Sequence, residues 1–291
     1  MNSTSRDVSV IVPALNEARG IVSTIERLRR VALEKSWNME LIVIDDGSHD
    51  ETGNLARESG AIVIRHPTNG GYGLSLQDGI RVSHAPIIAI TDADGTYPVE
   101  ELGHLIEMID EGYDMAVGAR QGDEYKKGWW KYPARIMFRW LSEYVAGRSI
   151  PDINSGLRVM KRERLMPHYE RTCFGFSFTT SLTLIFFLNG FFVGYHGITY
   201  ASRIGETKVR HFRDTLRTAQ ILVSVISIYN PIKLFLLIAA TCFIVSFLFG
   251  MIAVLTGATS FVLISACLFG VSPVVFALGP LAESVRLNGK R

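Results

Sequence analysis

A long uncharged segment near the C-terminus places the strongest constraint on how this chain of 291 residues can fold. The 49 residues at 234–282 contain no Asp, Glu, Lys, Arg or His. A helix that crosses a bilayer needs about 20 apolar residues, so the segment is long enough for two crossings. Its polar stretch at 256–260 is where we expect the turn between them. The sequence therefore predicts transmembrane helices at 233–256 and 260–282, followed by a short tail at 283–291.

A second uncharged stretch, at 172–195, also has the length of a membrane span. It is interrupted by three glycines and contains several Ser and Thr residues and Asn189. A third crossing would also put the C-terminus on the opposite side of the membrane from the N-terminal part. We therefore expect a buried helix at Phe178–Leu188 that leads into a strand at Phe192–Tyr200, and a third crossing is the alternative.

The net charge of +2 is distributed unevenly. Residues 1–119 carry 9 basic and 19 acidic side chains, a net charge of −10, and residues 120–291 carry 21 and 9, a net charge of +12. Basic residues beside an apolar hairpin suit anionic lipid headgroups. Nucleic acid is the rival partner for a basic half, but the sequence has no zinc-finger spacing, no aromatic RNA-binding signature and no basic helix. We expect a membrane and no nucleic acid as a partner.

Cysteine use and the ends of the apolar segment indicate a cytoplasmic orientation. Three cysteines form no disulfide framework, which fits a reducing compartment. The first seven residues have no apolar core, so no signal peptide is expected. Lys233 and Arg286 flank the apolar segment, and the turn inside it is uncharged. The positive-inside rule then predicts an integral protein of the inner or plasma membrane, with its N-terminal domain and its C-terminus both in the cytoplasm.

The first 120 residues alternate between short apolar runs and amphipathic segments. The expected strands are Val8–Val12, Leu41–Ile44, Ile62–Ile64, Ile87–Thr91 and Met115–Val117, and the expected helices lie near Ala18–Lys35, Glu51–Ser59, Gly73–Ser83 and Val99–Glu111. This alternation predicts an α/β fold with a mostly parallel sheet. The first strand is not followed by G-x-G-x-x-G and no G-x-x-x-x-G-K-[ST] occurs, which disfavours a dinucleotide enzyme and a P-loop NTPase.

Carboxylates follow three of these expected strands. Glu17 follows the first, Asp45 and Asp46 follow the second, and Asp92 and Asp94 follow the fourth. Open α/β sheets bind ligands beyond the carboxyl ends of their strands. Two carboxylates one residue apart at such an end suit Mg²⁺ or Mn²⁺ that carries a diphosphate. The alternative is that the aspartates only cap the helices that follow.

Basic and aromatic residues alternate at 127–140, shortly after Arg120. The pattern is typical of a helix in a membrane interface, and equally of a helix that packs on a core and exposes a basic face. A later stretch, at 211–229, is amphipathic and leads directly into the first crossing. We expect a folded domain at 1–210 and a juxtamembrane helix on the bilayer surface at 211–232.

Several motifs, taken in order, resemble the inverting glycosyltransferases of family 2, which have the GT-A fold. They are Ser-Val-Ile-Val-Pro-Ala-Leu-Asn-Glu at 9–17, Ile-Asp-Asp-Gly-Ser at 44–48, the Gly-rich sequence at 69–73 and Asp-Ala-Asp at 92–94. Asn-Ser-Gly-Leu-Arg at 154–158 and Arg-Ile-Gly-Glu-Thr-Lys at 203–208 look like elements of the polyprenyl-phosphate branch, which includes dolichyl-phosphate mannose synthase and bacterial polyprenyl-phosphate glucosyltransferases. The resemblance implies a GT-A catalytic domain with a Rossmann-like, mixed but mostly parallel sheet.

The resemblance also implies roles for individual residues. The sugar donor would be bound by Pro13, Leu15, Glu17, Ile44, Asp45, Asp46, Asp92, Ala93 and Asp94. Asp94 and Asp92 would ligate the metal, with Thr96 in the place of a glutamine ligand. The acceptor phosphate would meet Ser155, Arg158, Arg203 and Lys208, and the catalytic set would be Asp92, Asp94, Arg120, Arg203 and Lys208.

The reaction that the resemblance implies is transfer of a sugar, with inversion, from a UDP- or GDP-sugar to undecaprenyl or dolichyl phosphate in a membrane. The product would serve cell-envelope glycan or glycoprotein assembly. Mg²⁺ or Mn²⁺ and cationic side chains would neutralise the leaving diphosphate. A lipid phosphate is already an anionic nucleophile and needs positioning more than a base.

Two other functions are alternatives. A processive polysaccharide synthase would share the N-terminal pattern, but here Arg139-Trp140 lacks the preceding Gln of the Gln-x-x-Arg-Trp motif. A membrane-anchored protein that binds nucleotide sugars without turnover is the second. The apolar hairpin also offers a surface for a homo-oligomer.

Overall fold

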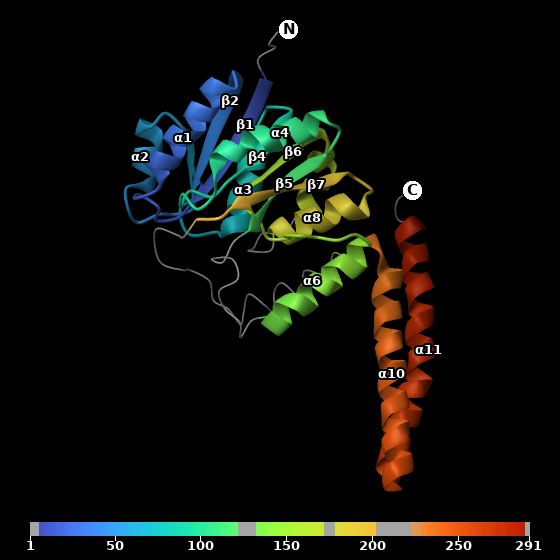
Figure 1. The fold of residues 1–291 in the computed structure, drawn as a ribbon. Helices are drawn as coiled ribbons and strands as arrows, with labels where there is room; N and C mark the ends of the chain where they lie inside the picture. Colours follow the sequence, from blue (N-terminus) through green and yellow to red (C-terminus); the bar gives the residue numbers. More distant parts are fainter. Residues whose placement is uncertain are drawn as a thin grey trace. The chain divides into compact units, whose positions relative to one another are not determined.

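The computed structural model describes residues 6–121, 132–171, 178–201, 223–224, 226–227 and 229–288. The chain divides into two compact units, Met1–Ile221 and Leu222–Arg291. The first contains a sheet with its helices and the second contains two long helices (Figure 1). The predicted surface helix at 211–232 lies mostly outside the described residues.

A seven-stranded sheet of order β3-β2-β1-β4-β6-β5-β7 forms the centre of the first unit. Its strands are β1 (Arg6–Ala14), β2 (Trp37–Asp45), β3 (Ile62–Arg65), β4 (Ile87–Ile90), β5 (Met115–Gln121), β6 (Arg158–Lys161) and β7 (Val193–Thr199). β6 is antiparallel to both of its neighbours, and the other pairings among the described strands are parallel. The predicted mostly parallel sheet is therefore confirmed. β6 was not predicted, because its four residues begin and end with a charge and form no apolar run.

The helices predicted for the first unit occur in the predicted order, among others that were not predicted. They are α1 (Ile21–Glu34), α2 (Thr52–Glu58), α3 (Tyr72–Val82), η1 (Val99–Glu101), α4 (Leu102–Asp110), α6 (Tyr132–Ala146), α7 (Arg162–Leu165), η3 (Met166–Arg171) and α8 (Phe178–Leu188). α1 begins later than predicted because the N–H groups of Gly20 and Ile21 both bond to the Glu17 carbonyl in a turn. α8 has the predicted bounds and is buried over most of its length, so the buried-helix prediction is confirmed.

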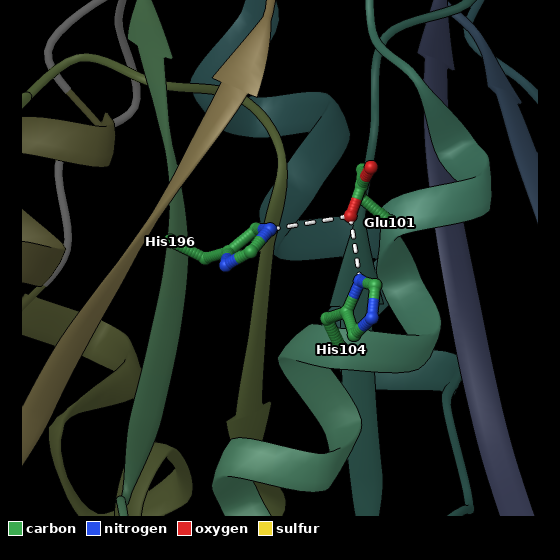
Figure 2. A group of neighbouring side chains, drawn as sticks. All are labelled: Glu101, His104 and His196. Carbon is green, nitrogen blue, oxygen red and sulfur yellow. Dashed lines mark hydrogen bonds and ion pairs between the residues drawn. The ribbon is translucent and has the colours of Figure 1, made fainter.

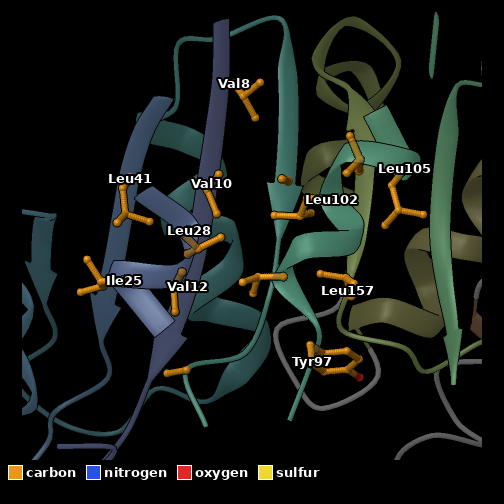
Figure 3. Packing of buried hydrophobic residues seen from close by; sticks show 14 of the residues in the cluster. Val8, Val10, Val12, Ile25, Leu28, Leu41, Tyr97, Leu102, Leu105 and Leu157 are labelled. Atoms are coloured by element: carbon orange, nitrogen blue, oxygen red, sulfur yellow. The ribbon is translucent and has the colours of Figure 1, made fainter. Parts of the chain in front are cut away.

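Hydrophobic residues cover both faces of the sheet. On one face Val8, Val10 and Val12 of β1 pack with Leu28 of α1 and Leu105 of α4 (Figure 3). On the other face, Ile11 of β1 packs in a cluster with residues of α3 and α8, among them Ile80 and Phe186. Successive residues of a strand point to opposite faces, so β1 contributes to both clusters. The result is a buried sheet with helices on both sides, whose carboxyl edge is left for polar side chains.

The second unit is a pair of apolar helices, α10 (Pro231–Thr256) and α11 (Thr259–Asn288). By length and composition both are able to cross a membrane. Gly257, at φ 67°, ends α10 in the left-handed conformation that glycine tolerates best. Between the helices, the Ser246 and Ser265 hydroxyls each donate to the other residue's carbonyl at 2.8 Å. α11 runs six residues beyond the predicted 282, and a Glu283–Arg286 ion pair lies in this extension.

Two leucines on α1 give a matched test of this packing. Leu28 is 1% exposed in the core and Leu33, five residues later, is 81% exposed. We expect Leu28→Ala to lower the free energy of unfolding by roughly 2–5 kcal/mol, because it leaves a cavity, and Leu33→Ala to change it by less than about 0.5 kcal/mol. Urea unfolding of the full-length protein in detergent measures both, and equal losses would contradict the packing described here.

Candidate functional site

The carboxyl ends of β2, β1 and β4 are neighbours in the sheet, so the loops that follow them meet. The Asn16 backbone N–H donates to the Ser48 hydroxyl at 3.0 Å, and this contact joins the loops after β1 and β2. The Thr24 hydroxyl of α1 donates to the Ala93 carbonyl at 3.2 Å, next to Asp94. A Cβ at Gly20 would lie 2.9 Å from the same carbonyl oxygen, so α1 begins directly against the loop after β4. The structure thus brings the predicted carboxylates to one edge.

Asp94 is held in place by Thr96. Its Oδ1 accepts hydrogen bonds from the Thr96 amide at 3.1 Å and from the Thr96 hydroxyl at 2.6 Å. Thr96 is wholly buried and Asp94 is 7% exposed. The Thr96 hydroxyl therefore orients the Asp94 carboxylate. The family resemblance puts Thr96 in the place of a glutamine ligand, and in the structure Thr96 donates to Asp94, a predicted ligand.

Asp92 lies between α3 and the loop before β6. The Tyr72 hydroxyl at the start of α3 donates to Asp92 Oδ1 at 3.1 Å. Burial and the nearby Asp92 charge raise the pKa of Tyr72 well above its ordinary value, so Tyr72 stays a neutral donor. A Cβ at Gly156 would lie 3.0 and 3.1 Å from the two Asp92 carboxylate oxygens. Glycine at this position lets the loop backbone approach the carboxylate closely.

Arg120, near the end of β5, forms a bidentate ion pair with Asp152. Its Nε and Nη2 donate to the two Asp152 carboxylate oxygens at 2.7 and 2.9 Å. Asp152 is buried, and the Arg120 guanidinium also lies 5.5 Å from the Tyr200 ring centroid. Arg120 is therefore pre-oriented at this edge of the sheet. Sequence reasoning missed Asp152, although an acidic residue just before the 154–158 motif in a basic segment was a usable signal.

Ser155 and Arg158 turn into the domain. The Ser155 hydroxyl donates to the Gly118 carbonyl of β5 at 2.5 Å. The wholly buried Arg158 guanidinium has five N–H donors, and it makes five hydrogen bonds. Its acceptors are the carbonyls of Ile153, Ser155 (two bonds) and Thr179 and the Thr183 hydroxyl, at 2.5–3.5 Å. These side chains fasten the 153–158 segment to β5 and α8, and the Arg158 donors are all used by the protein itself.

Asp46 holds the Gly-rich loop that follows β3. Its Oδ1 accepts from the Gly70 amide at 2.8 Å and its Oδ2 accepts from the Gly71 amide at 2.9 Å. His66 Nδ1 lies 2.7 Å from Asp46 Oδ1, and His66 Nε2 lies 3.0 Å from Asp78 Oδ2. His66 thus bridges two carboxylates and braces Asp46. No motif in the sequence pointed to His66, because α2 and β3 lie between it and Asp46 along the chain.

Asp45 faces the opposite way, toward α2. Its Oδ1 accepts from the Ser48 amide at 2.9 Å. Its buried Oδ2 has no hydrogen-bond partner among the described residues, with the Arg65 Nε at 3.5 Å. A Cβ at Gly53 would clash with this oxygen, so α2 packs directly on it. The adjacent Asp45 and Asp46 therefore serve two different loops.

The remaining predicted residues fall into two groups. Pro13, Leu15 and Glu17 are partly buried at the end of β1, whereas Ile44 and Ala93 are buried. Arg203 and Lys208 lie outside the described residues, so the structure does not place them beside the carboxylates.

Comparisons with known proteins agree with this arrangement. Residues 9–180 match the model of the family described as glycosyl transferase family 2. The dolichyl-phosphate hexose transferase of Haloferax volcanii is 29% identical over 214 residues, which are 72% of this chain and 89% of that protein. The undecaprenyl-phosphate 4-deoxy-4-formamido-L-arabinose transferase of Serratia proteamaculans is 26% identical over 178 residues, 58% of this chain and 54% of that protein. The chain thus spans about half the length of this second relative.

The fold is similar to that of glucosyl-3-phosphoglycerate synthase from Mycobacterium tuberculosis. In complex with phosphoglyceric acid, that structure matches with a TM-score of 0.63 and 21% identity over 76% of this chain and 80% of that one. Its complex with Mn²⁺, UDP and glucosyl-3-phosphoglycerate matches with a TM-score of 0.62 and 20% identity, at the same coverage. The predicted GT-A-type fold is confirmed by this likeness. The chain therefore belongs to glycosyl transferase family 2, and it is a glycosyltransferase whose relatives include polyprenyl-phosphate sugar transferases.

Proposed function

We propose that this glycosyltransferase moves a sugar from a UDP- or GDP-sugar to a polyprenyl phosphate in a membrane. The observation that carries the proposal is the oriented carboxylate pair, Asp92 and Asp94, at the sheet edge of a chain that also has two helices long enough to cross a bilayer. The names of the relatives, which are transferases acting on dolichyl and undecaprenyl phosphate, support this acceptor class.

Asp92 and Asp94 are the proposed ligands of Mg²⁺ or Mn²⁺. Both are carboxylates, the ligand type these ions prefer, and each accepts a hydrogen bond from a hydroxyl group, of Tyr72 and Thr96 respectively. Such bonds commonly orient metal ligands. A similar fold binds Mn²⁺ together with UDP, which supports the choice of ion. When bound, the ion would supply charge neutralisation for the leaving diphosphate.

The nucleotide end of the donor is assigned to the loops after β1, β2 and β3. Pro13, Leu15, Glu17, Ile44 and Ala93 would line this part of the site, as the family resemblance implies. The contacts of Asp46 suggest that it acts by shaping the Gly-rich loop, and those of Asp45 suggest that it shapes the turn into α2. Asp45 and Asp46 would then support donor binding indirectly, by fixing the backbone of the loops that line the donor site.

The acceptor phosphate needs cationic partners and alignment with the anomeric carbon, but no strong base. Arg120, fixed by Asp152, is one proposed cation at the edge, and Arg203 and Lys208 are the others. Ser155 and Arg158 are assigned a positioning role, because their polar groups already bond to the protein. They would set the loop that lies against Asp92.

The membrane assignment is also a proposal. The helices α10 and α11 would cross the bilayer as a hairpin. In the sequence they follow a proposed catalytic domain at 1–210 and a proposed surface helix at 211–232. The C-terminal tail at 283–291 would face the cytoplasm with the catalytic domain. Contacts between hairpins of two copies would give a homo-oligomer.

The metal assignment is tested by Asp94→Ala. We expect it to lower transfer from radiolabelled UDP- or GDP-sugar to polyprenyl phosphate by at least about 100-fold, the scale for loss of a main electrostatic stabiliser. Excess EDTA should lower wild-type transfer similarly. Asp110→Ala, which removes an exposed carboxylate paired with Arg6, is the control and should retain activity.

One outcome of this assay tests the metal site, and two others separate the candidate functions. Full transfer by Asp94→Ala in excess EDTA would refute the metal site. Donor binding without transfer to any acceptor would favour the non-catalytic binding protein. Formation of a polymer instead of a lipid-linked monosaccharide would favour the processive synthase.

The brace on the Gly-rich loop is tested by His66→Ala. Loss of a hydrogen bond to a charged group costs about 1.5–3 kcal/mol, so the Gly70 and Gly71 amides should exchange with deuterium roughly 10- to 100-fold faster. His84→Ala removes an exposed histidine paired with Glu40 and should leave the exchange rates of the Gly70 and Gly71 amides unchanged. Unchanged exchange in His66→Ala would show that Asp46 holds the loop without His66.

The hairpin topology is tested by single cysteines in a variant that lacks the three natural ones. A cysteine at Ala258, in the uncharged turn, should react with an impermeant reagent added outside intact cells. A cysteine placed after Asn288 should react only once the membrane is opened. Labelling of the second site from outside would contradict the hairpin with cytoplasmic ends.

A further inference from the structure

A second group of potential metal ligands lies away from the carboxylate edge. Glu101 ends η1, His104 lies in the first turn of α4 and His196 lies in the middle of β7 (Figure 2). Figure 2 shows the three side chains grouped together, with dashed lines from one Glu101 carboxylate oxygen to a nitrogen of each ring. The proposed mechanism uses none of them.

The geometry of this group is close to that of a metal site. Glu101 Oε2 lies 2.7 Å from His104 Nδ1 and 3.2 Å from His196 Nε2. The three ligand atoms lie within 4.8 Å of one another. In a tetrahedral zinc site, bonds of about 2.0–2.2 Å put neighbouring ligand atoms about 3.4 Å apart. Small side-chain rotations would therefore be enough to admit an ion.

The ligand types point to a transition metal. Imidazole nitrogens suit Zn²⁺, Cu²⁺ and Ni²⁺, whereas Mg²⁺ prefers oxygen alone. The side chains of Glu101, His104 and His196 are 33%, 60% and 37% exposed, so solvent can deliver an ion and water can complete its coordination. We propose that Glu101, His104 and His196 bind Zn²⁺ or a similar divalent transition-metal ion, at a site separate from Asp92 and Asp94.

An ion at this site would connect two segments that lead to the candidate active site. Glu101 follows the loop that carries Asp94, and β7 leads to Tyr200. The Ala201 amide donates to the Thr96 carbonyl at 3.1 Å, and the Tyr97 and Tyr200 rings pack edge to face with centroids 5.1 Å apart. The ion would hold the start of α4 to β7, a few residues along each segment from these contacts. Binding to the folded state alone would also raise its apparent stability.

The test uses full-length, tag-free protein in detergent after treatment with EDTA and dialysis. Calorimetric titration with ZnCl₂ should show a binding event in the wild type and also in Asp94→Ala, which lacks a ligand of the proposed Mg²⁺ or Mn²⁺ site. His104→Ala and His196→Ala should each weaken this event by at least about tenfold. His84→Ala, which removes another exposed histidine with a carboxylate partner, should leave it unchanged.

Co²⁺ provides a second readout, because its visible absorption reports nitrogen ligands in a tetrahedral site. The spectrum should appear in wild type and Asp94→Ala and be lost in His196→Gln, which keeps a polar side chain without a strong ligand. Zn²⁺ affinity that is the same in wild type, His104→Ala and His196→Gln would overturn the proposal. So would the absence of Zn²⁺ binding by the wild type, since the three side chains would then form only a hydrogen-bonded cluster.

Discussion

The hydrogen bonds of the buried Arg158 guanidinium are the interactions on which the candidate site most depends. A charge inside a protein is tolerated only when its hydrogen bonds are satisfied, and each of its N–H groups has an oxygen acceptor here. These bonds join the start of β6, the preceding loop and α8. That loop carries Asp152 to Arg120 and Gly156 to Asp92. One buried cation thus sets the position of several polar groups at the sheet edge.

The antiparallel direction of β6 explains why this loop reaches the sheet edge that carries Asp92 and Asp94. The parallel strands present their carboxyl ends there, whereas β6 presents its amino end. Register pairs Arg158 with Ile90 of β4 and with Val117 of β5. The residues just before β6 therefore lie beside those just after β4 and β5. Asp92, just after β4, and Arg120, near the end of β5, are thus both neighbours of the residues that precede β6.

The two proposed metal sites differ in their ligand chemistry. Asp92 and Asp94 present hard oxygen atoms, oriented by the Tyr72 and Thr96 hydroxyl groups. The set at Glu101, His104 and His196 combines oxygen with imidazole nitrogen on a more exposed surface. Hard divalent ions and transition-metal ions are separated by this difference in ligand chemistry. The loop between Asp94 and Glu101 connects the two sets, and its Tyr97 packs on Tyr200.

The local sequence pattern determined most of the strands and helices of this protein and its family. Apolar runs identified the parallel strands, the absence of charge identified α8 and the apolar pair α10 and α11, and ordered motifs identified the family. Side-chain partners depended on the tertiary structure. Asp45 and Asp46 are adjacent in sequence but face different loops, Thr96 and Arg158 bond to the protein itself, and His66 and Asp152 carried no recognised motif. The physical reason is that a hydrogen bond depends on distance in space, and the contacts from Arg120 to Asp152 and from Asp46 to His66 join residues 32 and 20 positions apart in the sequence.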